Sequence, residues 1–169
     1  MMNSKNPLQK QLEHQRFLHG VDYVRRESHS LKKLNTSELA RLNQILTGSD
    51  QDPWRFESVH VQIPTGQVHE INIVSNPMAR AREILSHAFE ELGNQHLLQS
   101  TCDLYSHLVL EHLFQDANRR TSVLATIWLL DVAGISVDPE KLLKIPLGNL
   151  RIPAEKEKFV RSIAALISS

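Results

Sequence analysis

Nine residues in the second half of the chain combine side chains that suit the chemistry of phosphates: His112 to Arg120 spell HLFQDANRR. The His112 imidazole, with an ordinary pKa near ~6.5, can accept a proton at neutral pH. Asp116 is a hard oxygen ligand of the kind that holds Mg²⁺ beside phosphate groups. Arg120 can grip a phosphate with a planar, two-pronged guanidinium.

The main chain of this segment can contribute as well. It lies between a predicted helix at 96–113 and a strongly apolar helix that ends at Gly134. The start of a helix presents unpaired N–H groups and a positive partial charge. Short residues such as Ala117 and Asn118 let successive amides converge on an anion, while Phe114 is expected to peg the loop to the core. A base, a metal ligand, an amide cradle and an arginine are the components of phosphoryl or nucleotidyl transfer.

The elements that must position these residues are mostly helices. Asn35 and Glu38 form a predicted capping box, in which Asn35 caps the helix and Glu38 reaches back to the cap residue. An apolar stripe follows as far as Gly48, and Asn76-Pro77 opens a further helix as cap and first residue. The full set of predicted helices is 8–26, 35–48, 76–92, 96–113, a helix from the motif to Gly134, a short one from Asp138-Pro139, and a last one from Pro153.

Residues 54–74 have a different period. Polar and apolar residues alternate from Phe56 to Ile63 and again from Val68 to Val74, with Pro64-Thr65-Gly66-Gln67 between the two runs. This pattern predicts a β-hairpin. A lone hairpin is marginal in water, so it must pack on the helices.

Composition narrows the functional class. The chain has 19 Lys+Arg and 19 Asp+Glu, so binding to nucleic acid through bulk charge is not expected. Cys102 is the only cysteine, which favours a reducing, cytoplasmic compartment and excludes an intramolecular disulfide or a cysteine-based zinc site. No apolar run is long enough to span a membrane. The N-terminus lacks a secretory signal, although delivery into a host cell by another route stays open.

The segment at 112–120 resembles the motif of the Fic/Doc (Fido) family, H-x-F-x-[D/E]-[G/A]-N-[G/K]-R. The five matching fixed positions are His112, Phe114, Asp116, Asn118 and Arg120. Family members carry this motif between two core helices of a helical domain with an upstream hairpin flap. The resemblance therefore implies a mainly α, single Fic-like domain over 35–150, with an N-terminal helical extension at 1–34 and a C-terminal helix at 151–169 packing on it.

The resemblance also implies an activity, which in most members is transfer of AMP from Mg·ATP to a Ser, Thr or Tyr hydroxyl of a target protein. By position, His112 would be the base and Asp116 would hold Mg²⁺. The nucleotide phosphates would be bound at Ala117, Asn118, Arg119 and Arg120. The hairpin at Val59, His60, Val61, Gln62 and Ile63 would dock the target by β-augmentation.

Three departures from the AMP-transferring pattern leave alternatives open. Arg119 replaces a usual glycine, and Val123 stands where a second arginine is usual. The Ala-Asn-basic-Arg sequence is closer to Doc, a toxin that phosphorylates its target, so a kinase is the second interpretation. The self-inhibitory [S/T]-x-x-x-E-[G/N] motif of many members has no match here, which suggests a separate antitoxin-like inhibitor as partner, or no restraint. A degenerate, non-catalytic interaction module is the third interpretation.

Other conspicuous residues have simpler explanations. His107 and His112 are five apart and do not share a helix face, so a zinc-protease site is excluded, and His107 is expected to pair with Glu111. Trp128 and Cys102 are expected in the core.

Overall fold

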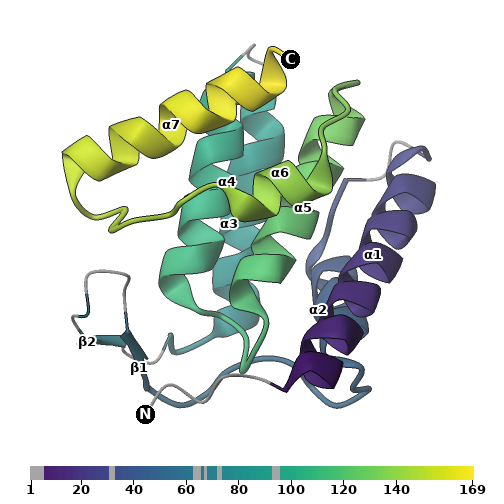
Figure 1. Ribbon diagram of the computed structural model, residues 1–169, viewed down its shortest axis with the longest axis vertical. Helices are drawn as coiled ribbons and strands as arrows, with labels where there is room; N and C mark the ends of the chain where they lie inside the picture. The colour runs from purple at the N-terminus through teal and green to yellow at the C-terminus, as the bar shows by residue number, and fades with distance from the viewer. Residues whose placement is uncertain (1–5, 31–32, 63–65, 67, 72–73, 93–95) are drawn as a thin grey trace.

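The protein is a helical bundle with a small hairpin at one end (Figure 1). The computed structural model describes residues 6–30, 33–62, 66, 68–71, 74–92 and 96–169. In those ranges the elements are α1 (Pro7–Ser28), α2 (Thr36–Thr47), β1 (Val59–Gln62), β2 (Val68–Ile71), α3 (Pro77–Leu92), α4 (Leu97–Glu111), α5 (Asn118–Val132), α6 (Pro139–Lys144) and α7 (Pro153–Ile167). The predicted mainly helical, Fic-like class with a hairpin is confirmed.

Most predicted helix boundaries have the expected caps. The Asn35 side chain accepts a hydrogen bond from the Glu38 amide at 2.9 Å, and Asn76 accepts from the Ala79 amide at 2.9 Å. The capping box itself is only half formed. The Glu38 carboxylate accepts a hydrogen bond at 2.7 Å from the Tyr23 hydroxyl of α1, so it joins two helices where the sequence pattern predicts a reciprocal cap.

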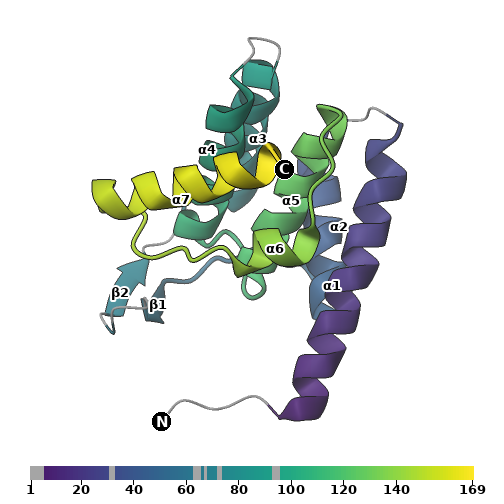
Figure 2. The ribbon, with the colours of Figure 1, turned by 45° about the horizontal axis from the view of Figure 1, so that its top comes forward.

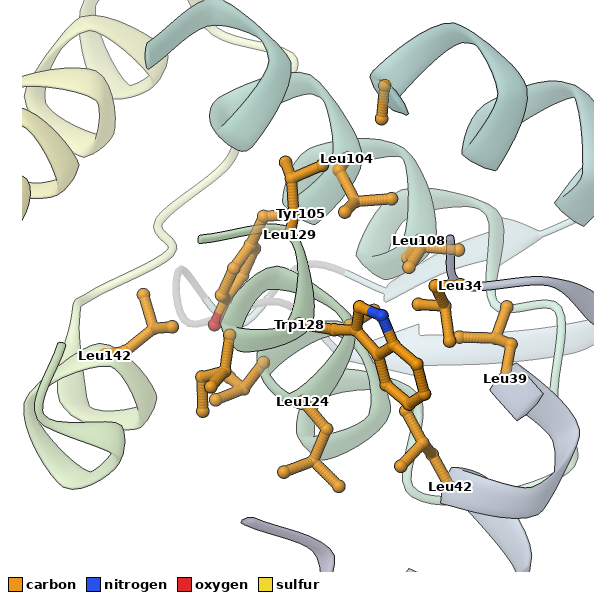
Figure 3. Close-up of a cluster of buried hydrophobic side chains, with 14 of the residues drawn as sticks. Leu34, Leu39, Leu42, Leu104, Tyr105, Leu108, Leu124, Trp128, Leu129 and Leu142 are labelled. Atoms are coloured by element: carbon orange, nitrogen blue, oxygen red, sulfur yellow. The ribbon is translucent and has the colours of Figure 1, made fainter. Parts of the chain in front are cut away.

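Helix α5 is the centre of the core. Every residue from Thr121 to Leu130 is buried, and α5 packs against α1, α2, α4 and α6. Figure 3 shows the Trp128 ring of α5 among leucines of α2 and α4, and Trp128 is fully buried as predicted. Because α5 packs against four other helices, the position of its N-terminus, where the motif ends, is set by the core.

The first and last helices both pack on this core. A Cβ added to Gly20 of α1 would lie 2.5 Å from Leu124 Cδ1 of α5, so the two helices approach closely at that point. Helix α7 crosses α4, and its Phe159 ring lies 5.2 Å from the Tyr105 ring, between centroids. Helix α1, within the predicted N-terminal extension, is thus part of the bundle and packs along α5.

The hairpin lies at the end of the bundle where α4 connects to α5 (Figures 1 and 2). Strands β1 and β2 are antiparallel, with Val59 opposite Ile71 and His60 opposite Glu70. The described strands are shorter than the predicted alternating runs, and Ile63 lies outside the described residues. In the described ranges, no helix combines the length and apolar character needed to cross a bilayer.

Candidate functional site

The connection between α4 and α5 contains two residues in an unusual backbone conformation. His112 has φ 45° and Ala117 has φ 57°, both in the left-handed region that favours glycine. For a residue with a Cβ this conformation costs about 1 kcal/mol, so other contacts must hold it. The two turns bring the ring of His112 and the start of α5 to the same end of the bundle.

The Asn118 side chain closes this loop from inside. Its Oδ1 accepts a hydrogen bond from the Phe114 amide at 3.0 Å, and its Nδ2 donates to the Phe114 carbonyl at 2.9 Å. Asn43 of α2, which is buried, donates from Nδ2 to the Asp116 carbonyl at 2.8 Å and to Thr121 Oγ1 at 2.9 Å. The motif asparagine therefore shapes the loop, and α2 fixes where the loop lies.

The segment before the hairpin holds the outer side of the loop. Trp54 and Phe114 form an isolated antiparallel bridge, and their rings stack at 4.8 Å between centroids. The Arg55 amide donates to the Leu113 carbonyl at 2.9 Å, and the Gln115 amide donates to the Pro53 carbonyl at 3.0 Å. Phe114 is 2% exposed, in agreement with its predicted role as a peg, and Trp54 packs under the loop.

The first turn of α5 lines a cleft. The first intrahelical bond is donated by the Thr121 amide to the Ala117 carbonyl at 2.9 Å, so the amides of Asn118, Arg119 and Arg120 come before it. Their N–H groups carry the positive end of the helix dipole. The cleft has a volume of about 410 Å³ and is lined by His60, His112, Gln115, Asp116, Ala117, Asn118, Arg119 and Arg120.

The predicted metal ligand and the predicted phosphate-binding Arg119 have different surroundings. Asp116 is exposed in the cleft, and its Oδ1 accepts a hydrogen bond from the Ala117 amide at 2.5 Å. The Arg119 guanidinium donates to the carbonyls of Leu143 and Ile145 at 2.6 and 2.8 Å. The Arg119 side chain is thus tied to the end of α6, and its amide remains in the first turn.

The predicted phosphate clamp, Arg120, lies between the cleft and α1. Its Nη1 is 3.7 Å from Glu13 Oε2, and the two side chains are 16% and 21% exposed. Glu13 is four residues before the buried Phe17, on the inner face of α1. A carboxylate therefore already lies beside the guanidinium that the motif assigns to phosphate.

The predicted base is electrostatically tuned. Burial lowers the pKa of His112 below its usual 6.5, and the positive charges of Arg55 and Arg151 lower it further. The neutral imidazole is the form that can accept a proton, so these surroundings favour the basic form at neutral pH.

The hairpin contributes at least one residue to the cleft. His60 of β1, one of the predicted docking residues, lines it together with His112. Val59, Val61 and Gln62 also belong to β1. Ile63, the last predicted docking residue, is outside the described residues.

Several other sequence expectations can be compared with the structure. His107 Nδ1 lies 3.5 Å from Glu111 Oε1, as predicted, but the stronger partner of Glu111 is Arg80 of α3, at 2.7 and 2.5 Å. Burial opposes ionisation of Glu111, yet the hydrogen bonds from His107 and Arg80 outweigh it and lower the pKa to about 2. Cys102 is buried, and burial raises the pKa of its thiol to about 12.

Three residues around the site were missed by sequence reasoning. Asn43 had a visible signal, because it is a polar residue among the buried leucines of α2. Arg55 and Glu13 had none, since their partners in the α4–α5 connection and in α5 lie far away in the sequence. Among the described residues, no group of three His, Cys, Asp or Glu side chains is placed to bind a metal ion.

Comparisons with known proteins identify the fold. No family model and no curated protein matches the sequence. A Fic-domain-containing signaling protein from Bacteroides thetaiotaomicron is 16% identical with a TM-score of 0.66, over 99% of this chain and 75% of that one. A Fic family protein from Desulfovibrio desulfuricans is 14% identical with a TM-score of 0.57, over 97% of this chain and 53% of that one. The chain therefore has a Fic-like fold.

Proposed function

We propose that this protein is a Fic-type transferase that moves AMP from Mg·ATP to a hydroxyl of a target protein. The observation that carries the proposal is that one cleft is lined both by His112 and by the first-turn residues of α5, whose amides precede the first intrahelical bond. The Fic-like fold and the matching motif residues support it from two further directions.

In the proposed reaction the target hydroxyl oxygen bonds to the α-phosphorus of ATP. The bond from that phosphorus to its bridging oxygen breaks, and pyrophosphate leaves. His112 takes the hydroxyl proton, and its lowered pKa keeps the ring in the proton-accepting form. The amides of Asn118, Arg119 and Arg120 would bear the negative charge of the phosphate oxygens, because they are oriented before the substrate arrives.

The donors present fit a nucleotide-borne magnesium ion. Mg²⁺ is usually held by one or two carboxylates together with substrate phosphates and water, and Asp116 offers one exposed carboxylate beside the amide cradle. When bound, the ion would supply charge neutralisation at the phosphate oxygens. The Ala117 amide keeps one Asp116 oxygen oriented, and the second oxygen is then available to a cation.

Two observations bear on which phosphorus is attacked. The Arg119 side chain is bonded to α6, so its bulk does not redirect the nucleotide from the amide cradle, and this favours AMP transfer. Val123 is fully buried in α5, so position 123 supplies no second arginine to the phosphates, and this favours the Doc-like kinase as the second candidate.

Isotope placement separates these candidates. The protein is incubated with Mg²⁺, a cell lysate and ATP labelled at either the α- or the γ-phosphate. Label transferred to a target protein only from the α position supports AMP transfer, whereas label only from the γ position supports phosphorylation. The label is expected to vanish in His112→Ala. No label from either donor contradicts both activities and favours a non-catalytic interaction module.

A further inference from the structure

Arg55 is a buried arginine that the proposed chemistry does not use. It is only 4% exposed, and it lies between the hairpin and the end of α4. A buried guanidinium is costly unless its N–H groups are hydrogen-bonded, so its partners indicate what it is for.

On one side, Arg55 donates hydrogen bonds to the C-terminus of α4. Its Nε donates to the His112 carbonyl at 2.5 Å, and its Nη2 donates to the Glu111 carbonyl at 3.1 Å. These carbonyls are at the negative end of the helix dipole, where a cation is most favourable. They also flank the left-handed turn at His112, whose φ of 45° needs external support.

On the other side, the same guanidinium reaches the base of the hairpin. Its Nη1 donates to the Glu57 carbonyl, two residues before β1, and to the Ile71 carbonyl at the end of β2, the latter at 3.5 Å. A two-stranded hairpin has little stability of its own, so these bonds matter for where it lies.

We propose that Arg55 is a positioning residue that locks the His112 turn and the hairpin into one unit. Its planar fork donates to carbonyls of both at once, so this side chain directly joins the turn that carries the base to the hairpin that would dock a target. Lysine cannot replace it, because an ammonium group is a point donor that cannot span both sets of carbonyls. The catalytic consequence rests on the proposed function, but the structural coupling does not.

Charge and geometry can be separated with variants. Arg55→Lys keeps the positive charge and loses the fork, and Arg55→Met loses both. Arg151→Met is the matched control, because Arg151 also acts on His112 through its charge but donates to none of these carbonyls. The other charged or titratable groups of the cleft, His60, Asp116, Arg119 and Arg120, stay unchanged.

Two readouts test the coupling without any activity. The first is amide hydrogen exchange at Gln115 and in the paired strands, and the second is NMR titration of the His112 ring, assigned by its loss in His112→Ala. Arg55→Lys should speed exchange at these amides by about tenfold or more, with a smaller rise of the ring midpoint than in Arg55→Met. Arg151→Met should raise the midpoint and leave exchange at the wild-type rate.

The proposal is overturned if Arg55→Lys exchanges as slowly as wild type, or if Arg151→Met loosens the hairpin equally. If Arg55→Met fails to fold, the comparison of Arg55→Lys with the Arg151→Met control still tests the coupling. If the wild type transfers label, Arg55→Lys should lower the transfer rate about tenfold with little change in nucleotide affinity. If the wild type transfers nothing, the proposed function fails, and exchange and titration still decide the role of Arg55.

Discussion

Replacing Asn118 with alanine tests whether the hydrogen bonds of this side chain hold the α4–α5 loop in place. The change removes the bond from the Phe114 amide at 3.0 Å and the bond to the Phe114 carbonyl at 2.9 Å, and both Phe114 groups stay buried. An unsatisfied buried polar group costs about 1–3 kcal/mol. Two such losses predict a destabilisation of about 2–6 kcal/mol.

Thermal and urea unfolding followed by circular dichroism measure this loss. For a chain of this size each 1 kcal/mol moves Tm by about 2–4 °C, so a decrease of about 4–24 °C is expected. Asn149→Ala is the control, since the Asn149 side chain is also buried, and its Oδ1 accepts a hydrogen bond from the Arg151 amide. A loss in Asn118→Ala no greater than in Asn149→Ala would refute the reasoning.

Three further changes test the site. Ala117→Gly should stabilise the protein by about 0.5–1 kcal/mol, because Ala117 has a φ of 57°; a lower urea midpoint would contradict this. The lowered pKa of His112 places the acid limb of the kcat/KM profile below pH 6.5, and an acid limb above 6.5 would be inconsistent. The same shift makes folding stability fall as the pH drops through 6.5, because the unfolded state takes up the proton first. Glu13→Gln should tighten Mg·ATP binding about twofold to tenfold, measured by calorimetry, because it removes the carboxylate that lies 3.7 Å from Arg120. Glu157→Gln, at an exposed ion pair, is the control and should leave the affinity unchanged. Equal affinities in the two variants would argue against competition between Glu13 and phosphate for Arg120.

The features that could be predicted well from the sequence depend on neighbouring residues along the chain. The Asn35 cap, the helix that Asn76 opens and the apolar character of α5 are local patterns, and each is present. The loop at 112–120 was also marked by its residue types, and most of the residues that line the cleft, although not Gln115, could be named from them, while their roles stay predictions.

What the sequence did not predict depends on contacts between distant segments. Glu38 turns to Tyr23 because α1 lies beside α2, and no local pattern contains that information. The contact of Glu13 with Arg120 and the bonds of Arg55 to the end of α4 arise in the same way. The Arg119 guanidinium donates to carbonyls at the end of α6, because that short helix packs beside α5. The position of Arg119 in the motif does not reveal this contact.

The central claim is that the first-turn amides of α5 hold a nucleotide phosphate beside His112. The most direct measurement follows the backbone amide signals by ¹H–¹⁵N NMR as Mg²⁺ and a non-hydrolysable ATP analogue are added. The account predicts that the largest shifts occur at Asn118, Arg119 and Arg120, with a change at the His112 ring. Shifts confined to another part of the fold, or none at millimolar nucleotide, would contradict it.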